Sequence, residues 1–89
     1  MIEGKTSKGF SFVLPDEVLD DMELLEGLTE LDNDNYSHLK ETITALLGQE
    51  QKAALYDFCR NKETKRVSAK MVMAELGEIF QAAEGNLKN

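Results

Sequence analysis

The sequence predicts a mainly α protein, a compact bundle of about four short helices preceded by a short N-terminal β-hairpin. Three observations lead to this fold class. The chain has 89 residues, near the lower end of single-domain size, and we expect residues 1–85 to form one helical domain. Apolar residues make up 42% of the chain and charged residues 30%, a balance typical of a folded domain. From Val18 onward, apolar residues recur at spacings of three and four, the period of an amphipathic helix.

Residues 1–14 have the pattern of a β-hairpin. Phe10 and Phe12 alternate with Ser11, which places both rings on one face of a strand. Residues 7–9 supply the turn chemistry before them. Because a lone two-stranded hairpin is only marginally stable in water, we expect this one to pack against the helices.

The first helix is predicted over residues 15–32. Pro15 suits the first helical position, because its φ is already near the helical value and its missing N–H needs no partner there. Asp16 and Glu17 then face the positive end of the helix dipole. The Asp and Asn residues of 32–35 compete for the backbone and end the helix. The positions expected to be buried are Val18, Leu19, Met22, Leu24, Leu25, Leu28 and Leu31.

Two more helices are predicted over residues 36–47 and 49–61. Asn35 or Ser37 is expected to cap the first of them, and Gly48 to separate the two by adopting a left-handed conformation. The inward-facing positions are expected to be Leu39, Ile43, Leu46 and Leu47 in the first helix, and Ala53, Ala54, Leu55, Phe58 and Cys59 in the second.

The last helix is predicted over residues 68–84. Ser68 is the expected N-cap and Gly85 the expected stop, which leaves residues 86–89 as a flexible tail. The apolar stripe of this helix consists of Met71, Val72, Leu76, Ile79, Phe80 and Ala83.

No catalytic, metal or cofactor signature stands out, so we expect a protein that is not an enzyme and uses no cofactor. When an EF-hand calcium loop is aligned from Asp32, Ser37 replaces the turn-forming glycine and Ile43 replaces the bidentate glutamate. His38 and Cys59 are the only residues of their types, and neither has the neighbours that a zinc site or a nucleophile needs. We interpret the aspartates as turn formers, His38 as a surface residue and Cys59 as a buried thiol.

Charge and cysteine content restrict the partners and the compartment. The net charge of −7 disfavours nucleic acid and anionic membranes as partners. A single cysteine favours a reducing, intracellular compartment. Residues 1–14 lack the apolar run of a signal peptide, and no stretch reaches the roughly 20 apolar residues that cross a bilayer. We therefore expect a soluble protein.

Charges of opposite sign are concentrated in different parts of the chain. Residues 15–39 hold nine acidic residues and no Lys or Arg, whereas residues 49–70 hold six cations and three acids. Two interpretations remain open. The two regions attract each other within one fold, or the acidic helix of one subunit meets the basic end of another in a head-to-tail homo-oligomer that builds rings or spirals. The candidate partner or self-association contacts are Asp20, Glu23, Glu30, Arg60, Lys65 and Arg66.

Methionine adds one more candidate contact. Met22 and Met71 fall on apolar stripes and are expected in the core. Met73 lies off the stripe formed by Val72 and Leu76, so we predict that its adaptable side chain is exposed to a partner.

Three segments occur in an order that resembles a known family. An aromatic pair after a glycine turn leads into an acidic helix that ends in Leu-Asp-Asn, and a leucine-glycine break precedes a Glu-Gln-Lys helix. The segments are GFSFVLPDEVLDDMELLEGLTELDN (9–33), LLGQEQKAALYDFCRN (46–61) and VSAKMVMAELGEIFQ (67–81). Their succession resembles the small tail assembly chaperones of long-tailed, siphovirus-type phages and prophages of Gram-positive bacteria.

This resemblance implies that the protein binds the tape measure protein and keeps it soluble until tail tube subunits polymerise around it. It also implies a location in the host cytoplasm and absence from the mature virion. The family often makes a longer product by programmed ribosomal frameshifting, and codons for residues 86–89 permit a slippery heptamer. A longer form of this kind would make the tail tube protein a further partner.

Two other functions remain open. Acidic residues at positions 16, 20, 23, 26 and 30 follow one helical flank, which is compatible with an acidic phage inhibitor or regulator that mimics DNA. A structural tail component is the other alternative, and it predicts presence in the finished particle.

Overall fold

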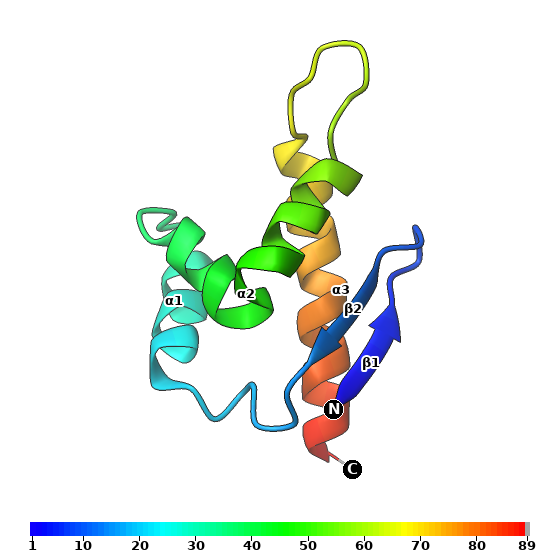
Figure 1. Ribbon diagram of the computed structural model, residues 1–89. Helices are drawn as coiled ribbons and strands as arrows, with labels where there is room; N and C mark the ends of the chain where they lie inside the picture. Colours follow the sequence, from blue (N-terminus) through cyan, green and yellow to red (C-terminus); the bar gives the residue numbers. More distant parts are fainter. Residues whose placement is uncertain (89) are drawn as a thin grey trace.

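The computed structural model describes residues 1–88 and consists of an N-terminal hairpin followed by three helices (Figure 1). The elements are β1 (Ile2–Lys5), β2 (Ser11–Leu14), α1 (Met22–Asp32), α2 (Leu39–Phe58) and α3 (Ala69–Lys88). The mainly α class with an N-terminal hairpin is confirmed. The structure has three helices rather than about four, because the segments predicted over 36–47 and 49–61 are joined into α2 across a kink at Gly48. Figure 1 shows α2 and α3 in the centre, α1 beside α2, and the hairpin on the side of α3 away from α1.

The hairpin is held by its turn and by the helices behind it. β1 and β2 are antiparallel, with Ile2 opposite Leu14 and Gly4 opposite Phe12. Gly9 adopts a φ of 103°, which favours glycine, and its N–H donates to the carbonyl of Thr6 at 2.9 Å. The ring of Phe12 packs over Gly4, where a Cβ atom would be only 2.6 Å from it. The expected packing against helices is confirmed, because β1 contacts α3 and β2 contacts α2.

Residues 15–21 form turns, and α1 begins seven residues later than the sequence predicted. The N–H groups of Val18 and Asp20 donate to carbonyls three residues back, at 3.1 and 2.8 Å, and the helical ladder does not continue from Pro15. Asp21 has an extended backbone and its carboxylate accepts a hydrogen bond from the N–H of Leu24 at 3.1 Å. This cap sets the helix start, while the turn before it places Val18 in the core.

The two helices predicted over 36–47 and 49–61 form the single bent helix α2. The expected break occurs at Gly48, whose backbone is not helical (φ 80°, ψ 165°). Helical structure resumes immediately after it. Neither Asn35 nor Ser37 caps α2: His38 occupies the N-cap position, and Asn35 instead accepts from the N–H of Ser37 at 3.1 Å.

Gln51 is the residue that supports this bend. Its side-chain amide donates to the carbonyl of Leu47 at 2.8 Å, across the break. The same side chain exchanges two hydrogen bonds of 2.7 Å with the backbone of Val13 on β2. The break is therefore tied to the hairpin, because the side chain that bonds across it also bonds to β2.

The inner face of the second half of α2 differs from the prediction. Leu55 and Cys59 are buried as expected, but Ala53 and Ala54 are exposed. Lys52 is buried in their place, and its Nζ lies 5.6 Å from the centre of the Tyr56 ring.

The last helix, α3, is longer than predicted. Ser68 caps it as expected, with its hydroxyl accepting from the N–H of Met71 at 3.2 Å. Gly85 is not a stop, because its φ is not left-handed and α3 continues to Lys88. Residues 86–88, where a tail was predicted, belong to α3, and Asn89 lies outside the described residues.

One apolar core joins the hairpin to the helices. Phe10, Phe12 and Leu14 from the hairpin pack with buried side chains of all three helices. The rings of Phe10 and Phe58 lie 5.5 Å apart in a tilted arrangement, which links the hairpin turn to the end of α2. The buried residues of the helices are Leu24, Ile43, Leu46, Leu47, Leu55, Val72, Leu76, Ile79 and Ala83, with Cys59 following α2.

Candidate functional site

Two grooves lie on either side of the first half of α2, and they differ in chemistry. One separates α1 from α2 and is lined largely by charged side chains. The other lies between the start of α2 and the start of α3 and is lined mainly by apolar and aromatic side chains. The geometry of each groove follows from how the flanking helices are held.

The seam between α1 and α2 depends on one glycine. Gly27 is buried against the side chain of Thr42, and no space remains there for a Cβ atom. The Thr42 hydroxyl donates to the carbonyl of His38 at 2.9 Å, which keeps the hydroxyl satisfied within α2. Beyond this contact, His38 Nδ1 lies 2.8 Å from a carboxylate oxygen of Glu30 and ties the two helices together.

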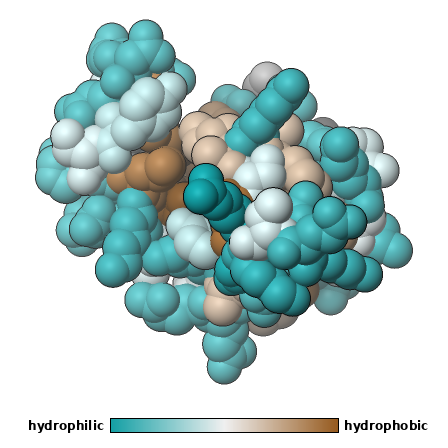
Figure 2. Space-filling view, turned by 90° about the horizontal axis from the view of Figure 1, so that it is seen from above, coloured by the Kyte–Doolittle hydropathy of each residue, from teal (hydrophilic) through white to brown (hydrophobic). Residues whose placement is uncertain are grey.

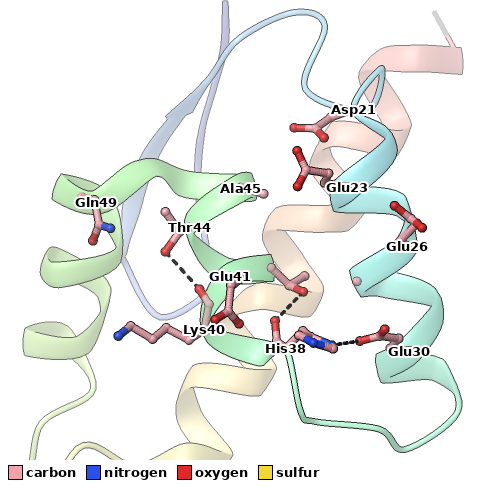
Figure 3. A pocket seen from close by; sticks show the side chains of 12 residues that line it. Asp21, Glu23, Glu26, Glu30, His38, Lys40, Glu41, Thr44, Ala45 and Gln49 are labelled. Carbon is pink, nitrogen blue, oxygen red and sulfur yellow. Dashed lines mark hydrogen bonds and ion pairs between the residues drawn. The ribbon is translucent and has the colours of Figure 1, made fainter.

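We call the cleft above this seam the acidic groove. It has a volume of about 680 Å³. Figure 3 shows the carboxylates of Asp21 and Glu23 on the α1 side and Glu41 on the α2 side around its opening. The hydrogen bond to Glu30, followed by the charge of that carboxylate, raises the pKa of His38. The charged residues that line the groove are Asp21, Glu23, Glu26, Glu30, Glu41 and Lys40, with His38.

The composition of the acidic groove limits what it can do. Within residues 1–88, no three His, Cys, Asp or Glu side chains are arranged to hold a metal ion. The groove instead concentrates negative charge on one surface, which attracts cationic groups of a partner.

We call the second cleft the apolar groove. It has a volume of about 530 Å³, and Met73 of α3 is among its lining residues. Tyr36 from the α1–α2 connection and Tyr56 from α2 contribute aromatic walls, and Lys70 supplies a cation. Figure 2 shows a brown, hydrophobic hollow between two hydrophilic lobes, viewed from the end of the molecule where α2 connects to α3. The remaining lining residues are Leu39, Ile43, Val67, Ala69 and Val72.

The predicted contact residues fall into three separate places. Glu23 and Glu30 line the acidic groove, while Asp20 is exposed in the turn before α1. Met73, the candidate for exposed contact with a partner, lines the apolar groove and is half-buried against the core.

The three predicted cations Arg60, Lys65 and Arg66 lie in the connection between α2 and α3. Arg60 is partly committed within the chain, since it donates to the carbonyl of Lys65 at 2.8 Å and lies 3.4 Å from the carboxylate of Asp57. Arg66 accepts a backbone hydrogen bond from Asn61 at 2.8 Å, which closes this connection on itself. The side chains of Lys65 and Arg66 are exposed.

Met22 was expected in the core, and this prediction is wrong. Its side chain is 70% exposed, because Leu24 and Gly27 turn the opposite side of α1 toward α2. Leu25 is also exposed, at 41%.

Tyr36 and Tyr56 line the apolar groove, but the sequence analysis did not identify them as site residues. The sequence does contain an indication for Tyr36, because an isolated aromatic residue in a polar turn segment is typical of a contact surface.

Two further predictions concern the burial of Cys59 and the absence of a membrane-spanning segment. Cys59 is buried as predicted, and burial is the main cause that raises the pKa of its thiol. Among the residues that the structure describes, no helix combines the length and the apolar character required to span a bilayer.

No protein-family model, no curated protein and no solved structure matches this chain.

Proposed function

We propose that this protein is a phage tail assembly chaperone, which binds the tape measure protein and keeps it soluble during tail assembly. The observation that carries the proposal is the apolar groove between the starts of α2 and α3, with Met73 and two tyrosines in its wall. A groove of this kind suits the apolar face of an amphipathic helix, and methionine adapts to irregular partners. The resemblance of residues 9–33, 46–61 and 67–81 supplies the identity of the client.

The charge of the chain supports the same role. A net charge of −7 on a small domain keeps complexes apart while the apolar groove is engaged. In this proposal the protein acts in the host cytoplasm and is absent from the finished particle. A frameshifted longer form would add the tail tube protein as a second partner.

Co-expression with the cognate tape measure protein tests the proposal. The wild-type chain should raise the soluble yield of the client, and Met73→Asp should reduce this yield because it places a charge in the apolar groove. Ala74→Asp is the matched control, since it adds the same charge at the next position, which is exposed and outside the groove. Equal rescue by the two variants would exclude Met73 from the client contact.

A second variant guards against unfolding, because Met73 also packs against the core. Tyr36 is 54% exposed and lies in a connection, so Tyr36→Ser removes a groove wall with little effect on folding. Circular dichroism should show a folded protein, and client solubility should fall. If neither the wild type nor any variant changes client solubility, the chaperone proposal is wrong.

The acidic groove favours a second candidate function, an inhibitor that mimics DNA. Several carboxylates gather there on one surface, as a phosphate mimic requires. This function predicts that a basic DNA-binding enzyme of the host is captured and that DNA competes for it. Charge reversal of Glu23 and Glu26 to Lys should then abolish capture, whereas Met73→Asp should leave it intact.

A further inference from the structure

The side of α1 that faces away from α2 carries two exposed apolar side chains, and a threonine extends the same side of the helix. Met22, Leu25 and Thr29 lie at i, i+3 and i+7, so they share one side of the helix. All three are exposed. The Thr29 hydroxyl donates to the carbonyl of Leu25 at 2.9 Å, so its polar group is satisfied within the helix. We call these three residues the outer face of α1.

The outer face is bordered by negative charge. Glu26 and Asp32 are exposed and occupy the helical positions on its two flanks. Residues 15–39 contain no Lys or Arg, so no cation of this segment offsets them. The outer face therefore combines exposed apolar side chains with acidic borders.

The apolar groove has the complementary character. Its lining is apolar and aromatic, and the charged residue in that lining is Lys70. The connection of residues 59–68, which leads into α3, carries Arg60, Lys62, Lys65 and Arg66 against the single acid Glu63. An apolar helix face with acidic borders fits such a groove in both hydrophobicity and charge.

The outer face of a chain is directed away from that chain's own fold. Gly27 and Leu24, on the opposite side of α1, are buried against the body of the molecule. The pair of His38 and Glu30 also holds α1 on α2. Because α1 is fixed in this orientation, its outer face is free to meet another molecule, and each chain offers one such face and one groove.

We propose that the apolar groove of one chain takes the outer face of α1 from a second copy of the chain. The contact is heterologous, since the two copies contribute different surfaces. It also covers the groove that we assign to the client helix, so self-association and client binding compete. The competition rests on the proposed function, whereas the contact between copies does not.

The contact is expected to be weak and reversible. α1 has 11 residues, and one face of such a helix buries less area than a stable protein interface of roughly 1,600 Å². A weak contact between copies is compatible with client binding, because a tight contact would block the apolar groove.

Mixing two complementary variants tests the contact. The double variant M22D/L25D loses the outer face and keeps the groove, and Met73→Asp loses the groove contact and keeps the outer face. In sedimentation velocity at low salt and high protein concentration, the wild type should self-associate and each variant alone should sediment as a monomer. An equimolar mixture should form a complex of twice the monomer mass and nothing larger, because only one face and one groove remain intact.

The opposite results overturn the proposal. A monomeric wild type, a variant that associates like the wild type, or a mixture that remains monomeric would each contradict a contact between these surfaces. Ala53→Asp is the control for added charge, since Ala53 is exposed on α2 outside both grooves, and it should associate like the wild type. Circular dichroism of each variant verifies that it is folded.

Charge reversal tests the electrostatic part separately. Lys70→Glu should weaken self-association several-fold, and the charge-swapped double variant E26K/K70E should recover part of it, because every contact then pairs opposite charges again. A double variant that associates no more strongly than Lys70→Glu would contradict the assigned pairing.

Client rescue separates this proposal from the proposed function. M22D/L25D should solubilise the tape measure protein at least as well as the wild type, because its groove is intact and uncovered. If complementary mixtures associate but no chain rescues the client, the self-contact stands and the chaperone function falls. If M22D/L25D fails to rescue where the wild type succeeds, the competition is wrong.

Discussion

The two sides of α1 are built from similar apolar residues, but only one side is covered. On the inner side, Leu24 is fully buried and Gly27 allows α2 to approach closely. On the outer side, Met22 and Leu25 are exposed to solvent. When a helix has more apolar residues than its own fold can bury, the remaining ones stay exposed to solvent. Such exposed apolar residues are available to a partner.

Truncating a buried side chain on the inner side of α1 should have the greatest effect on stability. Leu24→Ala should lower the free energy of unfolding by about 2–5 kcal/mol, because it leaves a cavity in the core. Met22→Ala on the outer side should change it by less than about 0.5 kcal/mol. Urea denaturation of dilute protein measures both. Similar losses for the two variants would mean that the sides of α1 do not differ as described.

The close approach at Gly27 provides the next test. Gly27→Val should cost about 1–3 kcal/mol, because its side chain has no room beside Thr42. Gly77→Ala in α3 is the matched control, since nothing lies near the added methyl group, and it should stabilise the protein by about 0.5–1 kcal/mol. Thermal unfolding compares them, and a Gly27→Val variant as stable as the wild type would show that α1 can shift outward.

The cap of α1 should have a smaller effect. Asp21→Ala removes the side-chain bond to the N–H of Leu24 and should cost about 1 kcal/mol. Asp20→Ala, one residue earlier, removes the same charge from a turn position and should be close to neutral. Equal costs would place the start of the helix before Asp21.

The smallest effect concerns the pair that joins α1 to α2 at its edge. Glu30 raises the pKa of His38 above its ordinary value of 6.5, so the folded state binds the proton more tightly than the unfolded state. The resulting stabilisation is fully present below pH 6.5 and is lost as the pH rises through the raised pKa. His38→Gln should remove this component.

The pH-dependent stabilisation from His38 is measured by urea unfolding of the wild type and His38→Gln between about pH 5 and pH 8. It equals the difference in the free energy of unfolding between the two proteins. The wild type should lose its advantage as the pH rises. A difference that is constant across this range, or that grows with pH, would contradict the pairing of His38 with Glu30.

Much of the local structure could be predicted because its causes lie within a few residues. The hairpin follows from the alternation of Phe10 and Phe12 and from Gly9, and Ser68 caps α3 as expected. The candidate site was predicted less well. Met73 does line a groove, but the other walls come from Tyr36 and Tyr56, which belong to distant segments. Helical period does not reveal which separate segments will meet.

The mainly helical class and the N-terminal hairpin follow from the amino-acid sequence alone, because hydrophobic period, turns and caps are short-range properties of the chain. The contacts between segments were not predictable in this way. The helical break at Gly48 and the helix after it follow from the sequence, but the bonds of Gln51 to β2 at that break, and the continuation of α3 past Gly85, appear only in the folded molecule. The fold also decided which side of α1 is covered, because burial depends on the surfaces that other segments offer, and Met22 faces away from all of them.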